Sequence, residues 1–513
     1  MSAVPAIRVH ACSSKPKNPE GEFVLYWMIG ARRVRHNFAL QRAVEHAREL
    51  GKPLVVFEPL RIGYRWASDR HHRFILDGMA DNEARLEGKS ALYYPYVEPE
   101  EDADKGLLEA LAARAAIVVT DEYPGFFLPH MVRAASARCP VAMEQVDSNG
   151  LLPLHAADKV FTTARSLRFF LQKKLPEHLD EVPVDDPLAR AELPVLKSLP
   201  RAITSRWPRA SANLLRGDAK ALAALPIDHA VGVVATRGGS AAAEAQLKKF
   251  LNERLDRYPE ERNDPDAHAA SGLSPYLHYG HISVHEAFAR LMRKDGWSKR
   301  KLSGKVTGQR EGWWGASPAV EAFLDEIITW REIGYNMAAF APNYDRFDSL
   351  PSWALATLKK HAKDPRPHLY SLRALAEGET YDLIWNAAQR ELVEDGTMHN
   401  YLRMLWGKKV LEWSKSPEDA LDALVEINNK YAIDGRDPNS QSGIFWVFGR
   451  YDRPWGPERP IFGTVRYMSS ENTMRKLHLK NYLARYGDSK KEEPEPPSKR
   501  AQAPHARAKN TKK

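Results

Sequence analysis

Cysteine is scarce in this 513-residue sequence, which contains only Cys12 and Cys139. Two distant thiols cannot build a disulfide framework or a thiolate metal cluster, so we expect a reducing compartment. Residues 1–22 lack the uninterrupted apolar run of a secretion signal, and no later segment approaches the ~20 apolar residues that a membrane-spanning helix needs. We therefore expect a cytoplasmic protein, associated with the nucleoid if the source is bacterial, and no membrane partner.

The short motifs of the commonest nucleotide and hydrolase sites are also missing. No glycine-rich G-x-G-x-x-G follows the first strand-like run, which continues instead as IGARRVRHN (29–37). The sequence has no G-x-x-x-x-G-K-[ST] phosphate loop, no G-x-S-x-G elbow and no Cys or His pair at the spacing of zinc ligands. These absences argue against an NAD site and against the common kinase and hydrolase mechanisms, and we predict no metal site.

What the sequence does contain is enough apolar material for sizeable cores, since 43% of its residues are hydrophobic. Its length alone suggests two to four domains. Lys and Arg number 75 against 66 Asp and Glu, which gives a formal net charge of +9. A positive balance favours a polyanionic partner such as nucleic acid but does not identify one.

The pattern of apolar residues changes along the chain and predicts two domains of different class. Residues 22 to about 150 alternate strand-length apolar runs with helix-period segments, which is typical of a doubly wound parallel α/β sheet. Strands are predicted at 23–29, 53–57, 91–97, 116–120 and 141–146. We therefore predict an α/β domain over 22–180.

The rest of the chain differs in composition. Residues 181–235 are rich in proline and irregular, which suits a connection between domains. Residues 236–486 carry long helical periods and predict a mainly helical second domain. The segment 487–513 contains eight Lys or Arg and four Asp or Glu and is predicted to be a disordered basic tail.

Four stretches carry residues that could perform chemistry. The first could bind an anion such as phosphate, and the second contains a carboxyl group that could act as an acid. Within 258–283, Ser271, Leu273 and Ser274 place hydroxyls and backbone N–H groups at a helix start, which suits phosphate but is also an ordinary helix cap. Within 322–336, Glu326 and Trp330 are four residues apart on a predicted helix. A carboxyl beside an indole can have a raised pKa and donate a hydrogen bond, although a simple Glu–Arg pair fits the pattern equally.

The third and fourth stretches are rich in tryptophan and in turn formers. Trp406 and Trp413 are seven residues apart, hence about 10 Å along a helix axis, and with Trp385 they could conduct electrons or simply fill a core. In 427–449, Asp434 and several Asn residues precede Trp446 in what also reads as an ordinary turn-rich loop.

In this order and spacing, the four stretches resemble the photolyase and cryptochrome family, and most closely the class II cyclobutane pyrimidine dimer photolyases. The similarity covers roughly residues 22–486. Its most specific parts are RNDP, SGLSPYLHYGHIS, the Glu326 helix, WNAAQREL, MHNYLRMLWGKKVLEW, DGRDPN and ERPIFGTVRYM. The resemblance implies an N-terminal α/β domain, a helical FAD-binding domain and a carbon-carbon lyase. In its implied reaction, light-excited reduced FAD passes an electron to a dimer flipped out of the DNA.

The resemblance also assigns roles to individual residues. FAD binding would involve Tyr258, Ser271, Leu273, Ser274, Arg403, Asn428 and Asp434. The lesion site would consist of Glu326 as the acid that hydrogen-bonds the dimer, Asn400 and Met404 at its border, and Trp330 and Trp446 as the aromatic clasp. Trp406, Trp385 and Trp413, in that order outward, would carry electrons from the surface.

The implied partner is ultraviolet-damaged DNA, and we expect a monomer. A second, antenna chromophore of the 8-hydroxydeazaflavin type is left open. Two rival functions remain at this point. A flavin photoreceptor of cryptochrome type would share the fold, and a flavin carrier or DNA-binding protein without photochemistry would share the composition.

Overall fold

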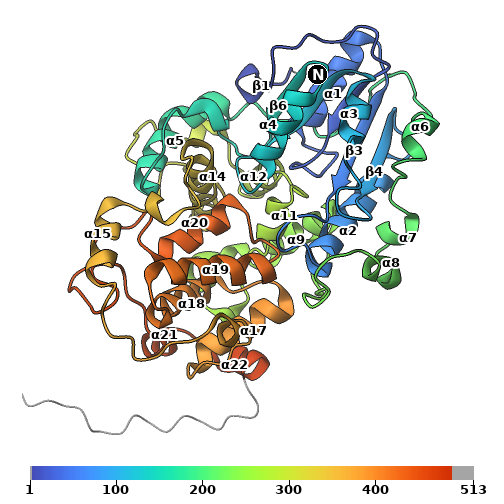
Figure 1. The fold of residues 1–513 in the computed structure, drawn as a ribbon. Helices are drawn as coiled ribbons and strands as arrows, with labels where there is room; N and C mark the ends of the chain where they lie inside the picture. Colours follow the sequence, from blue (N-terminus) through green and yellow to red (C-terminus); the bar gives the residue numbers. More distant parts are fainter. Residues whose placement is uncertain (1–2, 488–513) are drawn as a thin grey trace, which may run out of the picture.

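A six-stranded sheet forms the N-terminal part of the molecule (Figure 1). The computed structural model describes residues 3–487, so the predicted basic tail lies outside the described residues from position 488 onward. The strands are β1 (Val9–Ala11), β2 (Phe23–Trp27), β3 (Leu54–Leu60), β4 (Ala91–Val97), β5 (Ala115–Glu122) and β6 (Met143–Asp147). Their order is β1-β6-β5-β2-β3-β4; β2 to β6 are parallel, and β1 pairs antiparallel with β6.

Helices cover both faces of this sheet, which explains why its strands are nearly continuous apolar runs. They are α1 (Phe38–Leu50), α2 (Asp69–Leu86), α3 (Leu107–Ala112) and α4 (Leu128–Arg138). Alternate residues of β2 enter different cores: Val24 and Tyr26 pack with α1, whereas Phe23 and Leu25 pack with α3 and α4. The predicted doubly wound α/β sheet is confirmed, with β1 as an unpredicted antiparallel edge strand.

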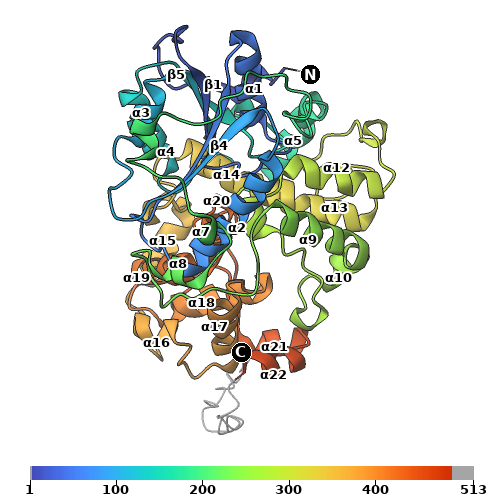
Figure 2. The same ribbon diagram turned by 90° about the vertical axis from the view of Figure 1, so that its right-hand side faces the viewer.

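The proline-rich connection contains only short helices and runs back past the sheet (Figure 2). These are α6 (Arg201–Thr204), α7 (Ala212–Leu215) and α8 (Ala219–Ala223). Before it, α5 (Ala164–His178) contacts a π-helical turn, Asp325–Trp330, in the helical part. The boundaries at 180 and 235 therefore remain predictions, because residues on the sheet side of position 180 also pack against the helical part.

Helices joined by loops make up the second part of the chain, and no strand occurs within residues 148–487. Its first helices are α9 (Ser240–Glu253), α10 (Tyr258–Glu261), α11 (Ser274–His278), α12 (Val284–Lys294), α13 (Pro318–Leu324) and α14 (Arg331–Phe340). The remainder are α15 (Ser352–Lys360), α16 (Leu372–Ala376), α17 (Leu383–Asp395), α18 (Asn400–Trp413), α19 (Pro417–Tyr431), α20 (Pro438–Val447), α21 (Ser470–Lys476) and α22 (Lys480–Tyr486). None of the helices within 3–487 has the length and apolar character to cross a bilayer.

Close helix packing in this part brings distant stretches of sequence together. Gly407 in α18 faces α20, where an added Cβ would lie 2.3 Å from a methyl carbon of Val447. Gly334 in α14 meets the start of α20, with the Pro438 carbonyl oxygen 2.8 Å from such a Cβ. Helix α20 is therefore held between α14 and α18. Of these helices, α18 carries five of the residues singled out above, which are Asn400, Arg403, Met404, Trp406 and Trp413.

Candidate functional site

Glu326 lies on the π-helical turn Asp325–Trp330, which joins α13 to α14. Turns of this type recur at functional sites because they re-aim side chains within a helix. Glu326 Oε1 accepts a hydrogen bond from Arg262 Nη1 at 2.5 Å. Burial raises the pKa of Glu326, and the charge of Arg262 opposes this rise. The plain Glu–Arg pair is thus present, and the same burial favours a carboxyl that can hold a proton.

Arg262 connects Glu326 to other predicted residues. Its guanidinium carbon lies 5.4 Å from the centre of the Tyr258 ring. His399 directly precedes α18, at whose start exposed Asn400 stands. The His399 backbone N–H donates to Glu391 Oε2 at 3.1 Å, and burial lowers the pKa of the His399 side chain to about 4.

Farther along α18, Arg403 forms a two-pronged ion pair with Asp434. The two N···O distances are 3.1 and 3.3 Å. Asn428 is buried nearby in α19 and donates from Nδ2 to Asn429 Oδ1 and Ser440 Oγ, both at 3.1 Å. No residue within 3–487 donates to Asn428 Oδ1, so the structure leaves an acceptor at this point of the site.

The two indoles of the predicted clasp lie on helices that pack together. Trp330 is the last residue of the π-helical turn and directly precedes α14, and Trp446 lies near the end of α20; both are half-buried. Lys408 Nζ lies 4.6 Å from the Trp446 ring centre, and Arg466 covers the same ring at 5.6 Å. No ring contact joins Trp330 to Trp446 in the described part of the chain. Met404, in the second turn of α18, is also half-buried.

The three tryptophans of the predicted wire form one buried stack. Trp406 and Trp385 are nearly parallel, with ring centres 6.2 Å apart, and Trp385 meets Trp413 edge-on at 5.5 Å. The Trp385 indole N–H donates to the Trp406 carbonyl at 3.0 Å, and that of Trp406 donates to Gln389 Oε1 at 3.0 Å. These bonds satisfy two buried donors and fix both rings in place.

Two tyrosines that sequence reasoning missed extend this stack. Tyr370 and Tyr381 lie 5.3 and 5.6 Å from Trp413, and Tyr381 is 51% exposed. The ring series therefore runs from Trp406 to the protein surface. The position of Tyr381, four residues before Trp385 at the start of α17, was the available sequence signal.

The Ser271–Ser274 turn stands apart from the groups above. The Ser271 carbonyl accepts from Gln246 Nε2 at 2.6 Å, and its Oγ accepts from the Leu273 N–H at 3.4 Å. Leu273 is buried and Ser274 is exposed. Helix α11 has only five residues, so its dipole contributes little and the hydroxyls and N–H groups must supply any anion binding. No hydrogen bond within 3–487 links this turn to Arg403 or Glu326.

No protein-family model matches the chain. The deoxyribodipyrimidine photo-lyase of Methanothermobacter thermautotrophicus is 34% identical over 483 residues, covering 94% of this chain and 98% of that protein. The chain belongs to the deoxyribodipyrimidine photo-lyase family. A photo-lyase of Potorous tridactylus is 32% identical (90% of this chain, 81% of that protein), and one of Arabidopsis thaliana is 33% identical (90% and 88%). The predicted photo-lyase enzyme is thereby confirmed.

The fold of this chain is also similar to that of a solved photolyase structure. A bacterial class III photolyase from Agrobacterium tumefaciens superposes with a TM-score of 0.61 at 18% identity, over 86% of this chain and 83% of that one. The predicted α/β plus helical architecture of a photo-lyase is therefore confirmed. The individual site residues and the class within the family stay predictions.

Three cations next to the predicted site of this photo-lyase family member were not anticipated. They are Arg262 beside Glu326, and Lys408 and Arg466 over Trp446. Burial lowers the pKa of Lys408 to about 7, and its ammonium lies 2.5 Å from the Val447 carbonyl oxygen. Arg262 is the first residue of the RNDP motif singled out above. Its partner, Glu326, lies 64 positions away, and only the fold brings the two together.

Proposed function

We propose that this photo-lyase family member repairs cyclobutane pyrimidine dimers in DNA, as a class II type enzyme with FAD as its light-driven cofactor. The tryptophan stack carries the flavin photochemistry of this proposal, and Glu326 with the indoles of Trp330 and Trp446 favours repair. The inner ring of the stack, Trp406, stands three residues after Arg403 on α18, and its outer end reaches exposed Tyr381. A purely structural core has no need for a ring series that runs from α18 to the surface.

The residues present fit a flavin. The Arg403–Asp434 pair offers a cation and a carboxylate side by side, and Asn428 offers an amide with an unused carbonyl oxygen. Ser271 and Ser274 would supply hydroxyls to the phosphates, and Tyr258 and Leu273 would enclose the same end. When bound, reduced FAD would supply the electron that light drives into the cyclobutane ring.

The protein groups around the lesion would then bind it and stabilise its charge. Glu326, whose pKa burial raises, can hold a proton and donate a hydrogen bond to the dimer's carbonyl oxygens as negative charge develops there. Trp330 and Trp446 would exchange base stacking for indole contacts on the flipped bases. Asn400 and Met404 would border them, and Lys408 and Arg466 would hold the Trp446 ring in place.

A photoreceptor of cryptochrome type is the nearest alternative. It would use the stack and the flavin but would have no need of Glu326 with two half-buried indoles. Illumination of the purified protein with dimer-containing DNA separates the functions. Loss of dimers in light and not in darkness supports repair. Flavin photoreduction without dimer loss indicates a photoreceptor, and a preparation without any flavin band removes both.

A second chromophore has a candidate place where the α/β part meets α19. A cavity of about 320 Å³ lies beyond the carboxyl end of β3, bordered by Tyr64, Trp66, Ile227, Glu426 and Lys430. Its volume is that of a small-molecule site, and ligands of parallel sheets bind at this edge of the strands. We expect Trp66→Ala to reduce any antenna chromophore that copurifies, while flavin content stays unchanged. An equal amount of chromophore in both proteins would exclude this cavity.

A further inference from the structure

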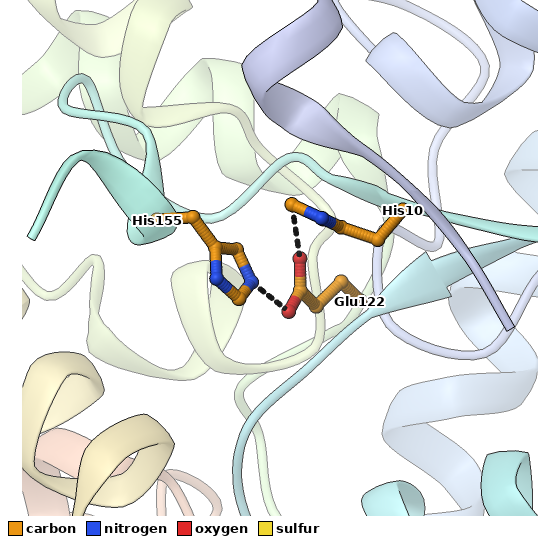
Figure 3. Close-up of side chains that lie close together, drawn as sticks. All are labelled: His10, Glu122 and His155. Atoms are coloured by element: carbon orange, nitrogen blue, oxygen red, sulfur yellow. Dashed lines mark hydrogen bonds and ion pairs between the residues drawn. The ribbon is translucent and has the colours of Figure 1, made fainter. Parts of the chain in front are cut away.

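Two histidines and a glutamate come together at the free edge of the sheet, away from every residue assigned above (Figure 3). His10 is the middle residue of β1, Glu122 ends β5, and His155 lies in the single turn Leu154–Ala156 that follows β6. One potential ligand atom of each lies within 4.8 Å of the other two. His155 Nε2 is 2.6 Å from Glu122 Oε1, and His10 Nε2 is 3.9 Å from Glu122 Oε2.

We propose that His10, Glu122 and His155 bind one divalent transition-metal ion, with Zn²⁺ as the best fit. Two imidazoles and one carboxylate are ligands that Zn²⁺ takes in proteins, and three protein ligands leave a fourth position for water. This site is distinct from the flavin and lesion residues, and the inference does not rest on the proposed repair activity. It also departs from the sequence-based expectation of no metal, which rested on the lack of a Cys or His pair at the spacing of zinc ligands.

Unsatisfied atoms in the cluster support a missing ligand. His10 Nε2 and Glu122 Oε2 are both shielded from solvent, yet neither has a hydrogen-bond partner within residues 3–487. The Glu122 side chain is only 10% exposed. A buried acceptor and a buried ring nitrogen that face each other at 3.9 Å without a bond are costly, since each loses its water. A cation held between them would satisfy both.

The spacing of the ligand atoms also suits a metal. Bonds of ~2.0–2.1 Å in a tetrahedron place neighbouring ligand atoms about 3.3 Å apart. The observed separations of 2.6 and 3.9 Å lie on either side of this value, so small side-chain rotations would bring the atoms to bonding positions. The His10 and His155 side chains are 30% and 36% exposed, which leaves a path for the ion and room for a water ligand.

The connectivity indicates what the metal would do. Strand β1 is three residues long and pairs with β6 through positions 9–11 alone. The turn that carries His155 leads from the sheet toward the helical part, where Phe340 packs edge-on against the His155 ring at 6.0 Å. A metal would tie the short edge strand and this turn to the end of β5, so its role is structural.

Metal titration of the full-length protein tests the proposal. The protein is made without a histidine tag, treated with a chelator and dialysed, and Zn²⁺ is then titrated by calorimetry. We expect one equivalent to bind and the thermal unfolding midpoint to rise with Zn²⁺. Failure of the wild-type protein to bind Zn²⁺ at micromolar concentrations would overturn the site without any variant.

Variants locate the ion. His155→Gln and His10→Gln should each weaken Zn²⁺ binding at least about 10-fold, because losing even an outer-shell partner of a metal ligand costs about 10–100-fold in affinity. His130→Gln, on exposed α4 with no role in the cluster, should bind as the wild type does. Equal affinity in the wild type and both cluster variants would place the ion elsewhere and contradict the proposal. Flavin content, read from the absorption spectrum, should be the same in all four proteins.

Discussion

Glu326 shows how one residue's surroundings set its chemistry. Burial raises the pKa of this carboxyl, and the charge of Arg262 acts in the opposite direction. A dimer that displaces water from this turn would add to the burial and favour the protonated, donating form. The residue can therefore respond to the lesion without any movement of the backbone.

We predict that Glu326→Ala lowers the yield of dimer repair about 10-fold, because a hydrogen bond to a charged oxygen is worth ~1.5–3 kcal/mol. Flavin should stay bound, since Glu326 contacts Arg262 and no proposed flavin ligand. The measurement is dimers lost per photon absorbed by chemically reduced protein. Glu253→Ala, at the exposed end of α9, is the matched control. Equal yields in both variants would remove Glu326 from the mechanism.

Glu332 gives a pH-dependent prediction outside the lesion residues. It accepts from the Leu151 N–H at 2.8 Å, and burial raises its pKa from the usual 4.5 to about 7. A raised carboxyl pKa means that the folded state binds a proton more tightly than the unfolded chain does. The tighter binding of this proton stabilises the folded state. The stabilisation is fully present below pH 4.5 and is lost as the pH rises through 7.

Relative to a Glu332→Gln variant, the wild-type protein should therefore lose stability across this interval, with a slope that approaches ~1.4 kcal/mol per pH unit. Thermal unfolding midpoints of both proteins, recorded from below pH 4.5 to above pH 7, measure the difference. Parallel profiles for the two proteins would show that Glu332 titrates normally.

At the residue scale the sequence predicted the tryptophan series, but it did not predict which side chains contact the other site residues. The Trp385, Trp406 and Trp413 rings form the expected series because α17 and α18 are neighbours in the chain with clear helical periods. Arg262 pairs with Glu326, and Lys408 lies over the Trp446 ring. Both contacts depend on long-range packing, which no local sequence pattern encodes.

On the scale of elements, α17 and α18 form the rigid support of the tryptophan stack. Replacing the middle ring, Trp385→Phe, should interrupt light-driven flavin reduction but leave repair by chemically reduced enzyme intact. The substitution should cost about 1–3 kcal/mol of stability, because a smaller ring leaves space in a full core. Flavin reduction under blue light with an external donor is the measurement.

Trp297→Phe is the control for this variant, because Trp297 packs in a separate core cluster with Trp314 and Phe288. It should photoreduce as the wild type does. Normal photoreduction in Trp385→Phe would show that electrons take another route.

The close approach of α18 and α20 makes a matched pair of glycine variants informative. Gly407→Ala should destabilise the protein by about 1–3 kcal/mol, because the added methyl meets Val447 at 2.3 Å. Gly443→Ala, in α20 with nothing within 4 Å of the new methyl, should be neutral or stabilising by ~0.5–1 kcal/mol. Denaturant unfolding followed by helical circular dichroism compares them. Equal stability of both variants would mean that the helices separate easily.

Element types were predictable where the hydrophobic period is long and regular. The strands β2 to β6 lie within two or three residues of their predicted bounds, since buried parallel strands are short apolar runs. Strand β1 was missed because three residues carry no period. The π-helical turn was predicted as ordinary helix, because the one-residue shift in hydrogen bonding leaves no mark in composition.

On the scale of the whole molecule, the two parts meet through buried cation contacts. Arg70 in α2 donates to the carbonyl oxygens of Leu392, Val393 and Tyr431 at 2.5–3.2 Å, and Arg331 in α14 donates to the Asn149 carbonyl at 2.6 Å. The fold class could be predicted from the order of helices and strands in the sequence. The interface between the two parts could not be predicted, because each of these contacts joins residues more than 180 positions apart.

The central claim is that light absorbed by a flavin in this protein opens dimers held at Glu326 and the two indoles. The action spectrum of repair tests it most directly: dimer loss per incident photon, measured wavelength by wavelength with chemically reduced protein. We predict that this spectrum follows the absorption of the bound reduced flavin and that no dimers are lost in darkness. Repair that proceeds equally in the dark, or no repair at any wavelength the flavin absorbs, would contradict the account.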